Sequence, residues 1–199
     1  MGYIEGESLT QMLQRLGVAG RLDWKHVYRI GYQLARALAF AHSQNVIHRN
    51  LTPQNVMIRA IDKTVLLGDL FLAKAMEGGL AEHLTRPGEV LGDIRYMAPE
   101  RLAGMSHVDH RSDMYGLGAL LYTLLAGRPP FEGSSPPELI VKVQTQNPEE
   151  VKKFQPAIPD ELNRIVQRLL VKHPDARYQE STELLKDLER LALLHHVPV

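Results

Sequence analysis

The 199-residue sequence contains no cysteine. A disulfide framework, a thiol nucleophile and a zinc site built on cysteine are therefore excluded, and a reducing compartment, with the cytoplasm as default, is the expected location.

Net charge is absent as well, because 23 Lys and Arg residues balance 23 Asp and Glu residues. No general excess of positive charge favours nucleic acid or anionic membranes, and we expect no nucleic-acid partner.

Long apolar runs are also missing. No stretch approaches the roughly 18 apolar residues typical of a membrane-spanning helix, and the N-terminus lacks the basic and apolar regions of a signal peptide. The hydrophobic content of 44% is nevertheless sufficient for one domain with a sizeable core. The sequence therefore predicts one globular domain with no membrane segment in this chain.

Apolar residues recur with helical spacing over most of the chain. Periodicity and flanking Gly, Pro or capping residues predict helices over residues 8–16, 23–43, 109–126, 137–146, 160–171 and 181–194. Ser8 and Asp23 are expected to cap the first two. Residues 56–59 and 64–69 are short β-prone runs, which predict a hairpin. Residues 70–108 show little periodicity, and such a long irregular segment in a compact domain is more often functional than accidental.

Four short motifs follow one another along the chain: HRNLTPQN at 48–55, GDLF at 68–71, RYMAPE at 95–100 and DHRSDMYGLG at 109–118. Their order and spacing resemble the catalytic loop, metal-binding motif, activation-segment end and central helix of the eukaryotic-like (Hanks-type) serine/threonine protein kinase family. The resemblance covers nearly the whole chain. It implies a mostly α fold, the kinase C-terminal lobe, which is a helical bundle around a central helix with a small β-hairpin. Within residues 1–199, it assigns 1–7 as a hinge remnant and 69–100 as the activation segment.

The same resemblance implies a nucleotide site. Phosphoryl transfer needs Mg²⁺ to bridge the nucleotide phosphates, and Mg²⁺ prefers hard oxygen ligands. By resemblance, Asp69 is the metal-binding aspartate and Asn55 the second metal ligand. Met57 matches the apolar floor beneath adenine, although core packing explains this residue equally well, and Ile4 matches a hinge residue whose backbone binds the base. ATP and Mg²⁺ are therefore the expected ligands, and we expect their binding to be weak.

Several residues depart from the family pattern. Asn50 occupies the position of the catalytic Asp, and a neutral amide can bind a substrate hydroxyl but cannot accept its proton as a carboxylate does. Thr52 occupies the position of the catalytic Lys, so it brings no charge to the transferring phosphate. Gln54 replaces a Glu, and Phe71 replaces the glycine of the metal-binding motif. Four clustered changes indicate a natural sequence released from catalytic demand, which is a pseudokinase-like pattern.

Other matched positions imply structural roles. Asp113 lies early in an apolar helix, where an unpaired carboxylate would be costly, and it is expected to accept backbone hydrogen bonds from a neighbouring loop. In the family this aspartate braces the catalytic loop near His48 and Arg49. Glu100 and Arg177 are implied to form a buried ion pair between the activation segment and the late helices.

Arg49 is further implied as the residue that binds a phosphorylated side chain of the activation segment. Between residues 69 and 100, however, only Thr85 and Tyr96 carry a hydroxyl. Asp93 also replaces a threonine that is usual in the family. The sequence therefore does not favour regulation by phosphorylation of this segment.

The upper half of a kinase nucleotide site is missing from the sequence, which contains no Gly-rich loop, strand Lys or helix Glu ahead of the hinge-like start. We therefore expect a lobe whose exposed apolar upper face is covered by a protein partner or by self-association. Three hypotheses remain: a pseudokinase that acts as a regulatory or interaction module, a fragment of a serine/threonine kinase that transfers phosphate when its N-lobe is present, and a ligand-free structural lobe that self-associates. Nucleotide binding would count against the third.

Overall fold

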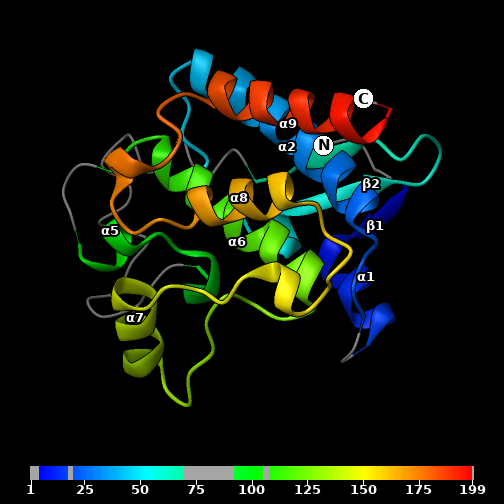
Figure 1. Cartoon of the computed structure of the whole chain (residues 1–199). Helices are drawn as coiled ribbons and strands as arrows, with labels where there is room; N and C mark the ends of the chain where they lie inside the picture. The colour runs from blue at the N-terminus through cyan, green and yellow to red at the C-terminus, as the bar shows by residue number, and fades with distance from the viewer. Residues whose placement is uncertain (1–4, 18–19, 70–91, 105–107, 199) are drawn as a thin grey trace.

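The computed structural model describes residues 5–17, 20–69, 92–104 and 108–198. The helices and strands in these ranges are, in chain order, β1 (Gly6–Ser8), α1 (Leu9–Leu16), α2 (Trp24–Ser43), η1 (Pro53–Asn55), β2 (Val56–Arg59), β3 (Val65–Leu67), η2 (Ile94–Tyr96), α5 (Pro99–Leu102), α6 (Arg111–Ala126), α7 (Pro136–Thr145), η3 (Val151–Lys153), α8 (Asp160–Leu169), η4 (Pro174–Ala176) and α9 (Ser181–His195). Figure 1 shows the longer helices gathered around α6, with the small sheet and α1 together at one side. This arrangement is a mostly helical domain with one small sheet, as the sequence predicts.

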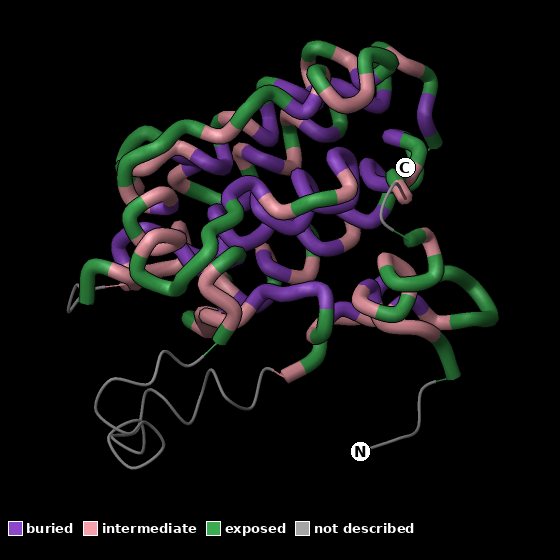
Figure 2. The backbone as a smooth tube through the Cα atoms, turned by 90° about the horizontal axis from the view of Figure 1, so that it is seen from below, coloured by how far each residue is buried: buried purple, intermediate pink, exposed green. Residues whose placement is uncertain are grey.

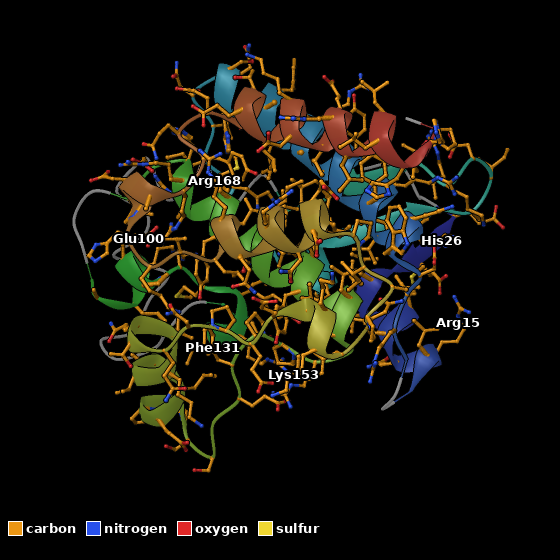
Figure 3. The ribbon with its side chains drawn as sticks, viewed as in Figure 1. Arg15, His26, Glu100, Phe131, Lys153 and Arg168 are labelled. Atoms are coloured by element: carbon orange, nitrogen blue, oxygen red, sulfur yellow. The ribbon has the colours of Figure 1, made fainter. Side chains whose placement is uncertain are left out.

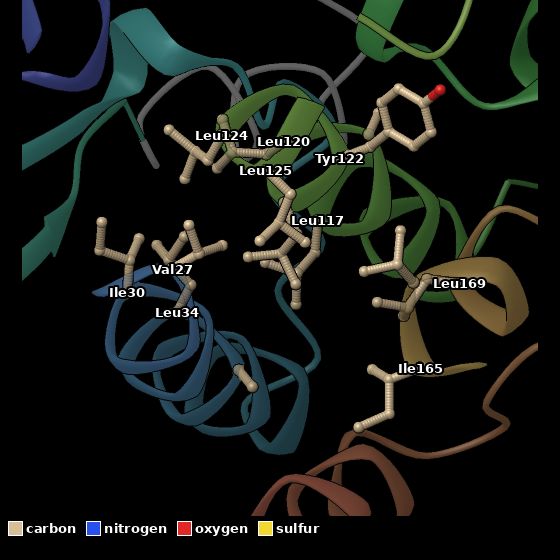
Figure 4. Packing of buried hydrophobic residues seen from close by; sticks show 14 of the residues in the cluster. Val27, Ile30, Leu34, Leu117, Leu120, Tyr122, Leu124, Leu125, Ile165 and Leu169 are labelled. Carbon is tan, nitrogen blue, oxygen red and sulfur yellow. The ribbon is translucent and has the colours of Figure 1, made fainter. Parts of the chain in front are cut away.

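Helix α6 is the centre of the core. Every residue from 112 to 126 is buried, which is typical of a helix enclosed by protein on all sides. Helix α2 packs against α6 and α9 packs against α2, while α8 contacts both α6 and α9. Leu34 of α2 and Leu169 of α8 approach α6 from different sides (Figure 4). Buried residues therefore fill the interior of the bundle, and exposed residues follow its outer helices and loops (Figure 2).

The predicted helices are confirmed, with small shifts at their ends. Ser8 caps α1 through a capping box, in which its hydroxyl accepts a hydrogen bond from the backbone N–H of Gln11 at 3.2 Å. Asp23 caps α2 by accepting the N–H of Lys25 at 3.0 Å. Helix α6 begins at Arg111, two residues later than predicted. The periodic apolar residues therefore located these helices correctly, because the buried stripe is what the packing requires.

The sheet has three antiparallel strands in the order β1-β2-β3. The predicted hairpin is confirmed in β2 and β3, but it was incomplete, because residues 6–8, which overlap the end of the assigned hinge remnant (1–7), add β1. A three-residue strand is too short to show a period, and its partner lies about fifty residues away in sequence. In β2, Val56 and Ile58 are buried, whereas Met57 points to the other face and pairs with Ser8 and Leu66.

Short helical turns also occur in the segment that showed little periodicity. η2 and α5 lie within residues 94–102, and both are too short for a 3.6-residue repeat to be visible in the sequence. Among the described residues, no helix combines the length and the apolar character needed to cross a membrane.

Candidate functional site

The carboxylate of Asp113 fixes the start of the loop formed by residues 48–55. Its two oxygens accept the backbone N–H groups of His48 at 2.8 Å and Arg49 at 2.7 Å, and its side chain is buried. Arg49 has a φ of 64°, which is uncommon for a residue with a side chain. Arg101 donates a hydrogen bond to the carbonyl of Arg49 from the other side. The strained backbone is thus held by bonds on both sides, a situation typical of functional loops.

The buried imidazole of His48 joins this loop to the end of β3. Its Nε2–H donates to the carbonyl of Gly68 at 2.7 Å, and its Nδ1 accepts the N–H of Asn50 at 3.3 Å. The N–H of Gly68 in turn donates to the carbonyl of Asn55 at 2.8 Å. Asp69 follows directly, with a φ of 66°. The two segments that carry Asn55 and Asp69 are therefore tied together by two hydrogen bonds, one to the carbonyl and one from the N–H of Gly68.

Asn55 and Asp69 offer the oxygen atoms that Mg²⁺ prefers. The side-chain amide of Asn55 donates through Nδ2 to the carbonyl of Asn50 at 2.8 Å, which orients its Oδ1 as an oxygen acceptor. Among the described residues, no group of three or more His, Cys, Asp or Glu side chains gathers as a metal site. Two oxygen donors suit Mg²⁺ held mainly by nucleotide phosphates and waters, which is how this ion usually binds in proteins. The donor set therefore fits a nucleotide-bound Mg²⁺.

A cavity of about 540 Å³ opens beside the loop, between α1 and residues 92–96. It brings together Asn50, Thr52 and Asn55, three of the predicted site residues. Thr52 is buried, with 8% of its surface exposed. The side-chain oxygen of Asn50 lies against Gly92, where a Cβ atom would come within 3.2 Å of it. We call this cavity the cleft.

The cleft carries no net charge. Of the described residues that line it, only Asp93 and Arg95 are charged, and they bind each other with an N–O distance of 2.6 Å. The hydrogen bonds that Arg95 donates to the Asp93 carboxylate raise the pKa of Arg95 above its usual value, so this guanidinium stays charged and paired. A cleft lined in this way offers little electrostatic attraction to a phosphoryl group.

The remaining predicted site residues lie outside the cleft lining. Met57 is half-buried on the face of the sheet that points away from the core, so it is not part of the main hydrophobic cluster. Ile4, Phe71 and Thr85 lie outside the described residues, as do most of the residues assigned to the activation segment.

Glu100 and Arg177 form a buried ion pair. Two nitrogens of the guanidinium donate to the two carboxylate oxygens at 2.7 and 2.8 Å, and Arg177 is 1% exposed. Arg177 also donates to backbone carbonyls of Val171, Lys172 and Arg111. Glu100, which is labelled in Figure 3, belongs to α5, and Arg177 lies in the loop before α9, so the pair ties these two segments together. Bidentate geometry and satisfied donors are what a buried pair requires.

The protein kinase domain family matches residues 1–188 of the chain. The chain belongs to the protein kinase family. It is 31% identical over 191 residues to PknB, a serine/threonine-protein kinase of Mycobacterium tuberculosis, and 32% identical over 191 residues to PknB of Mycolicibacterium smegmatis. Each match covers 96% of this chain and 30% of the relative, so the chain spans less than a third of these proteins.

Solved structures agree with this assignment. The kinase domain of PknI from Mycobacterium tuberculosis superposes with a TM-score of 0.70 at 26% identity, over 96% of this chain and 64% of that one. The chain therefore has a protein kinase fold and covers part of a kinase domain, with a small three-stranded sheet beside the helices. Members of this family use ATP and Mg²⁺.

Three residues that position the kinase-type loop were not recognised from the sequence. His42 donates from Nε2 to Asp113 at 2.9 Å, and its Nδ1 lies 2.8 Å from the hydroxyl of Ser181. Ser181 is 4% exposed, so this Ser-His-Asp group has no access to a substrate and its role is to position Asp113. Arg101 is the third, and burial lowers its pKa. The role of each of these three residues depends on a partner distant in sequence, so no local sequence pattern indicates that role.

Proposed function

We propose that this chain is a pseudokinase-type kinase lobe that acts as a regulatory or interaction module and binds ATP with Mg²⁺ weakly. The observation that carries the proposal is the cleft, in which Asn50 and Thr52 take the places of the catalytic Asp and Lys. Asn50 can accept and donate hydrogen bonds but cannot take the proton of a substrate hydroxyl at neutral pH. Thr52 is buried and uncharged, and the charges of the cleft cancel each other. The proton acceptor and the positive side-chain charge that the family uses in phosphoryl transfer are therefore both missing.

Ligand binding does not require the catalytic Asp and Lys, and the two positions matched to metal ligands are retained in this sequence. Asn55 and Asp69 would hold the Mg²⁺, which would neutralise phosphate charge when bound. The Asp113 and His48 contacts hold their backbone segments without involving Asn50 as an acid or base. Weak nucleotide binding without transfer is the combination that these residues support best.

An interaction role is supported by the outer face of the sheet. Met57 and Leu66 pair across β2 and β3, so their side chains share one face, and both are partly exposed. Met57 is also the residue matched to the adenine floor. The proposed contact is therefore with adenine, with a protein partner or with a second copy of the chain, each of which would cover apolar surface.

Thermal melting of this chain with and without millimolar ATP and Mg²⁺ tests the proposal. A ligand that binds only the folded state raises the melting temperature, and we expect a small rise. Asp69→Asn should abolish the rise, because it removes the carboxylate that would hold the metal. Asp62→Asn is the matched control, since this exposed carboxylate is bound by Arg59 and does not line the cleft, and it should leave the rise intact. No rise at millimolar nucleotide would overturn nucleotide binding and favour the ligand-free structural lobe.

A second candidate is a catalytic fragment, favoured by the serine/threonine-protein kinases among the relatives. Positioning and electrostatics dominate phosphoryl transfer, and a general base contributes typically only about 10²–10⁴-fold. The double change Asn50→Asp with Thr52→Lys should then raise transfer of ³²P from ATP to a serine or threonine peptide in the longest available form of the protein. Absence of any gain would contradict this candidate and leave the pseudokinase proposal standing.

A further inference from the structure

A second cavity, of about 790 Å³, lies on the opposite side of α1 from the cleft. Helix α1 forms a wall of both cavities. At 100° per residue, its two lining sets fall on opposite faces of the helix, with Thr10, Leu13 and Gln14 toward the cleft and Met12, Arg15 and Leu16 toward the second cavity. Nothing in the kinase chemistry described above uses this second cavity, which we call the α1–α2 cavity.

The floor of the α1–α2 cavity is apolar. Ile30 of α2 and Ile58 and Val65 of the sheet line it and are at most 9% exposed. Met12 and Leu22 also line it and pack against the main hydrophobic cluster. The volume is within the range of about 300–1,000 Å³ that is usual for small-molecule sites. A compact apolar group would therefore be desolvated on this floor.

Two of the carboxylates at the rim are already neutralised. Glu7 binds Arg15 with an N–O distance of 2.8 Å, and Asp62 binds Arg59 at 2.6 Å. Arg15 comes from α1 and faces the same side of the molecule as His26 of α2, another lining residue (Figure 3). Because each pair is neutral, the two pairs neither attract nor repel a charged ligand in the cavity by net charge.

Two cations at the rim have no carboxylate partner among the described residues. Arg29 of α2 and Lys63 of the β2–β3 turn both line the cavity and are exposed. Glu5 is the one lining carboxylate without a cationic partner in the same part of the chain. The charges of the lining residues themselves balance, but Arg59, which lies outside the lining, neutralises Asp62. Counted with Arg59, the rim has one positive charge in excess above an apolar floor. This combination complements an anion and opposes a cation.

We propose that the α1–α2 cavity binds a small amphipathic carboxylate, with its apolar body on the floor and its carboxylate between Arg29 and Lys63. The ligand class follows from the apolar floor and the two cations at the rim taken together. The apolar floor stabilises a hydrocarbon or aryl group by burial, at roughly 25 cal/mol per Å². The guanidinium and ammonium groups donate charge-assisted hydrogen bonds to the carboxylate. This site does not depend on nucleotide binding in the cleft.

Isothermal titration calorimetry with three probes of equal shape tests the charge requirement. Phenylbutyrate, phenylbutanol and phenylbutylamine share one apolar body and carry a negative, neutral or positive head. We expect the affinity to fall in that order. Equal affinity for the acid and the amine would overturn the proposal, and so would absence of phenylbutyrate binding at millimolar concentration.

Variants of this chain locate the site. Arg29→Gln and Lys63→Gln should each weaken phenylbutyrate about fivefold, which corresponds to about 1 kcal/mol, and should leave phenylbutanol unchanged. Arg36→Gln is the matched control, because Arg36 is exposed two turns further along α2 and does not line the cavity. Ala60→Trp, at the exposed rim, should block both probes while the melting temperature shows that the chain is folded. Unchanged phenylbutyrate affinity in both charge variants would overturn the site.

Discussion

At the scale of single residues, two buried carboxylates hold the region around the cleft. Asp113 accepts two backbone N–H groups and the imidazole of His42, and Glu100 binds the guanidinium of Arg177. A buried charge is tolerated only when its hydrogen bonds are satisfied, and both carboxylates meet this condition. Neither depends on the residue at position 50. The loop can therefore keep its shape although the catalytic Asp is replaced.

The Glu100–Arg177 pair gives a prediction for stability. Glu100→Leu leaves Arg177 buried without its counter-charge, and the free energy of unfolding should fall by about 3–5 kcal/mol. Asp62→Asn removes one partner of an exposed, solvent-screened pair and should lower the free energy of unfolding far less. Urea unfolding followed by circular dichroism measures both. Similar small losses in the two variants would show that the Glu100–Arg177 pair is not buried in solution.

At the scale of elements, close contact between helices decides how the bundle packs around α6. Gly118 of α6 faces α8, and a Cβ atom there would lie 2.6 Å from the Cβ of Leu169. Gly31 of α2 faces α6, and its added Cβ would lie 2.9 Å from a terminal methyl group of Leu121. A terminal methyl can move by a change of rotamer, whereas the Cβ of Leu169 moves only with its backbone. The α6–α8 contact is therefore the less tolerant of the two.

Gly118→Ala tests this contact. Alanine favours the helix by about 1 kcal/mol over glycine, but the clash with Leu169 forces α6 and α8 apart. We expect the overpacking to prevail and the free energy of unfolding to fall by about 1–3 kcal/mol. Gly31→Ala is the matched control and should cost less. A Gly118→Ala variant that is more stable than the wild type in chemical denaturation would contradict the close packing.

At the scale of the whole molecule, Lys172 joins the region after α8 to α7. Its ammonium group donates to the carbonyl of Val143 at 2.6 Å and lies 4.1 Å from the centre of the Phe131 ring. Burial, together with the positive charge of Arg177, lowers the pKa of Lys172 to about 8. The aromatic ring favours the charged form, and the two lowering effects outweigh it.

This lowered pKa makes stability depend on pH. Between about pH 8 and the unfolded pKa of 10.5, the unfolded chain binds a proton that folded Lys172 has lost. The contribution of Lys172 to the free energy of unfolding therefore rises with pH in this window. Relative to Lys172→Met, the wild type should gain stability between pH 7.5 and 9.5 in urea unfolding. Staying below pH 10 limits ionisation of tyrosines. A constant difference across this range would contradict the lowered pKa.

The sequence alone determined the long helices and the family. The apolar stripe of α2 follows from residue spacing, because this helix must turn its apolar side to the core. Helix α6 was located by its apolar residues, whereas its burial on all sides was seen only in the fold. Ser8 and Asp23 marked helix starts because capping is a local interaction. The motif order likewise indicated a protein kinase, and it pointed to Asn50 and Thr52 as replaced positions without any coordinates.

The tertiary structure decided the contacts between residues distant in sequence. β1 pairs with β2 across about fifty residues, and His42 reaches Ser181 across 139. The joint lining of the α1–α2 cavity by Arg29 and Lys63 above an apolar floor also depends on how elements meet. Periodicity and capping report only neighbours within a turn or two, whereas cavities and buried hydrogen-bond networks form where separate elements pack. For that reason the sequence determined the helices and the family, and only the folded chain determined the neutral cleft and the α1–α2 cavity.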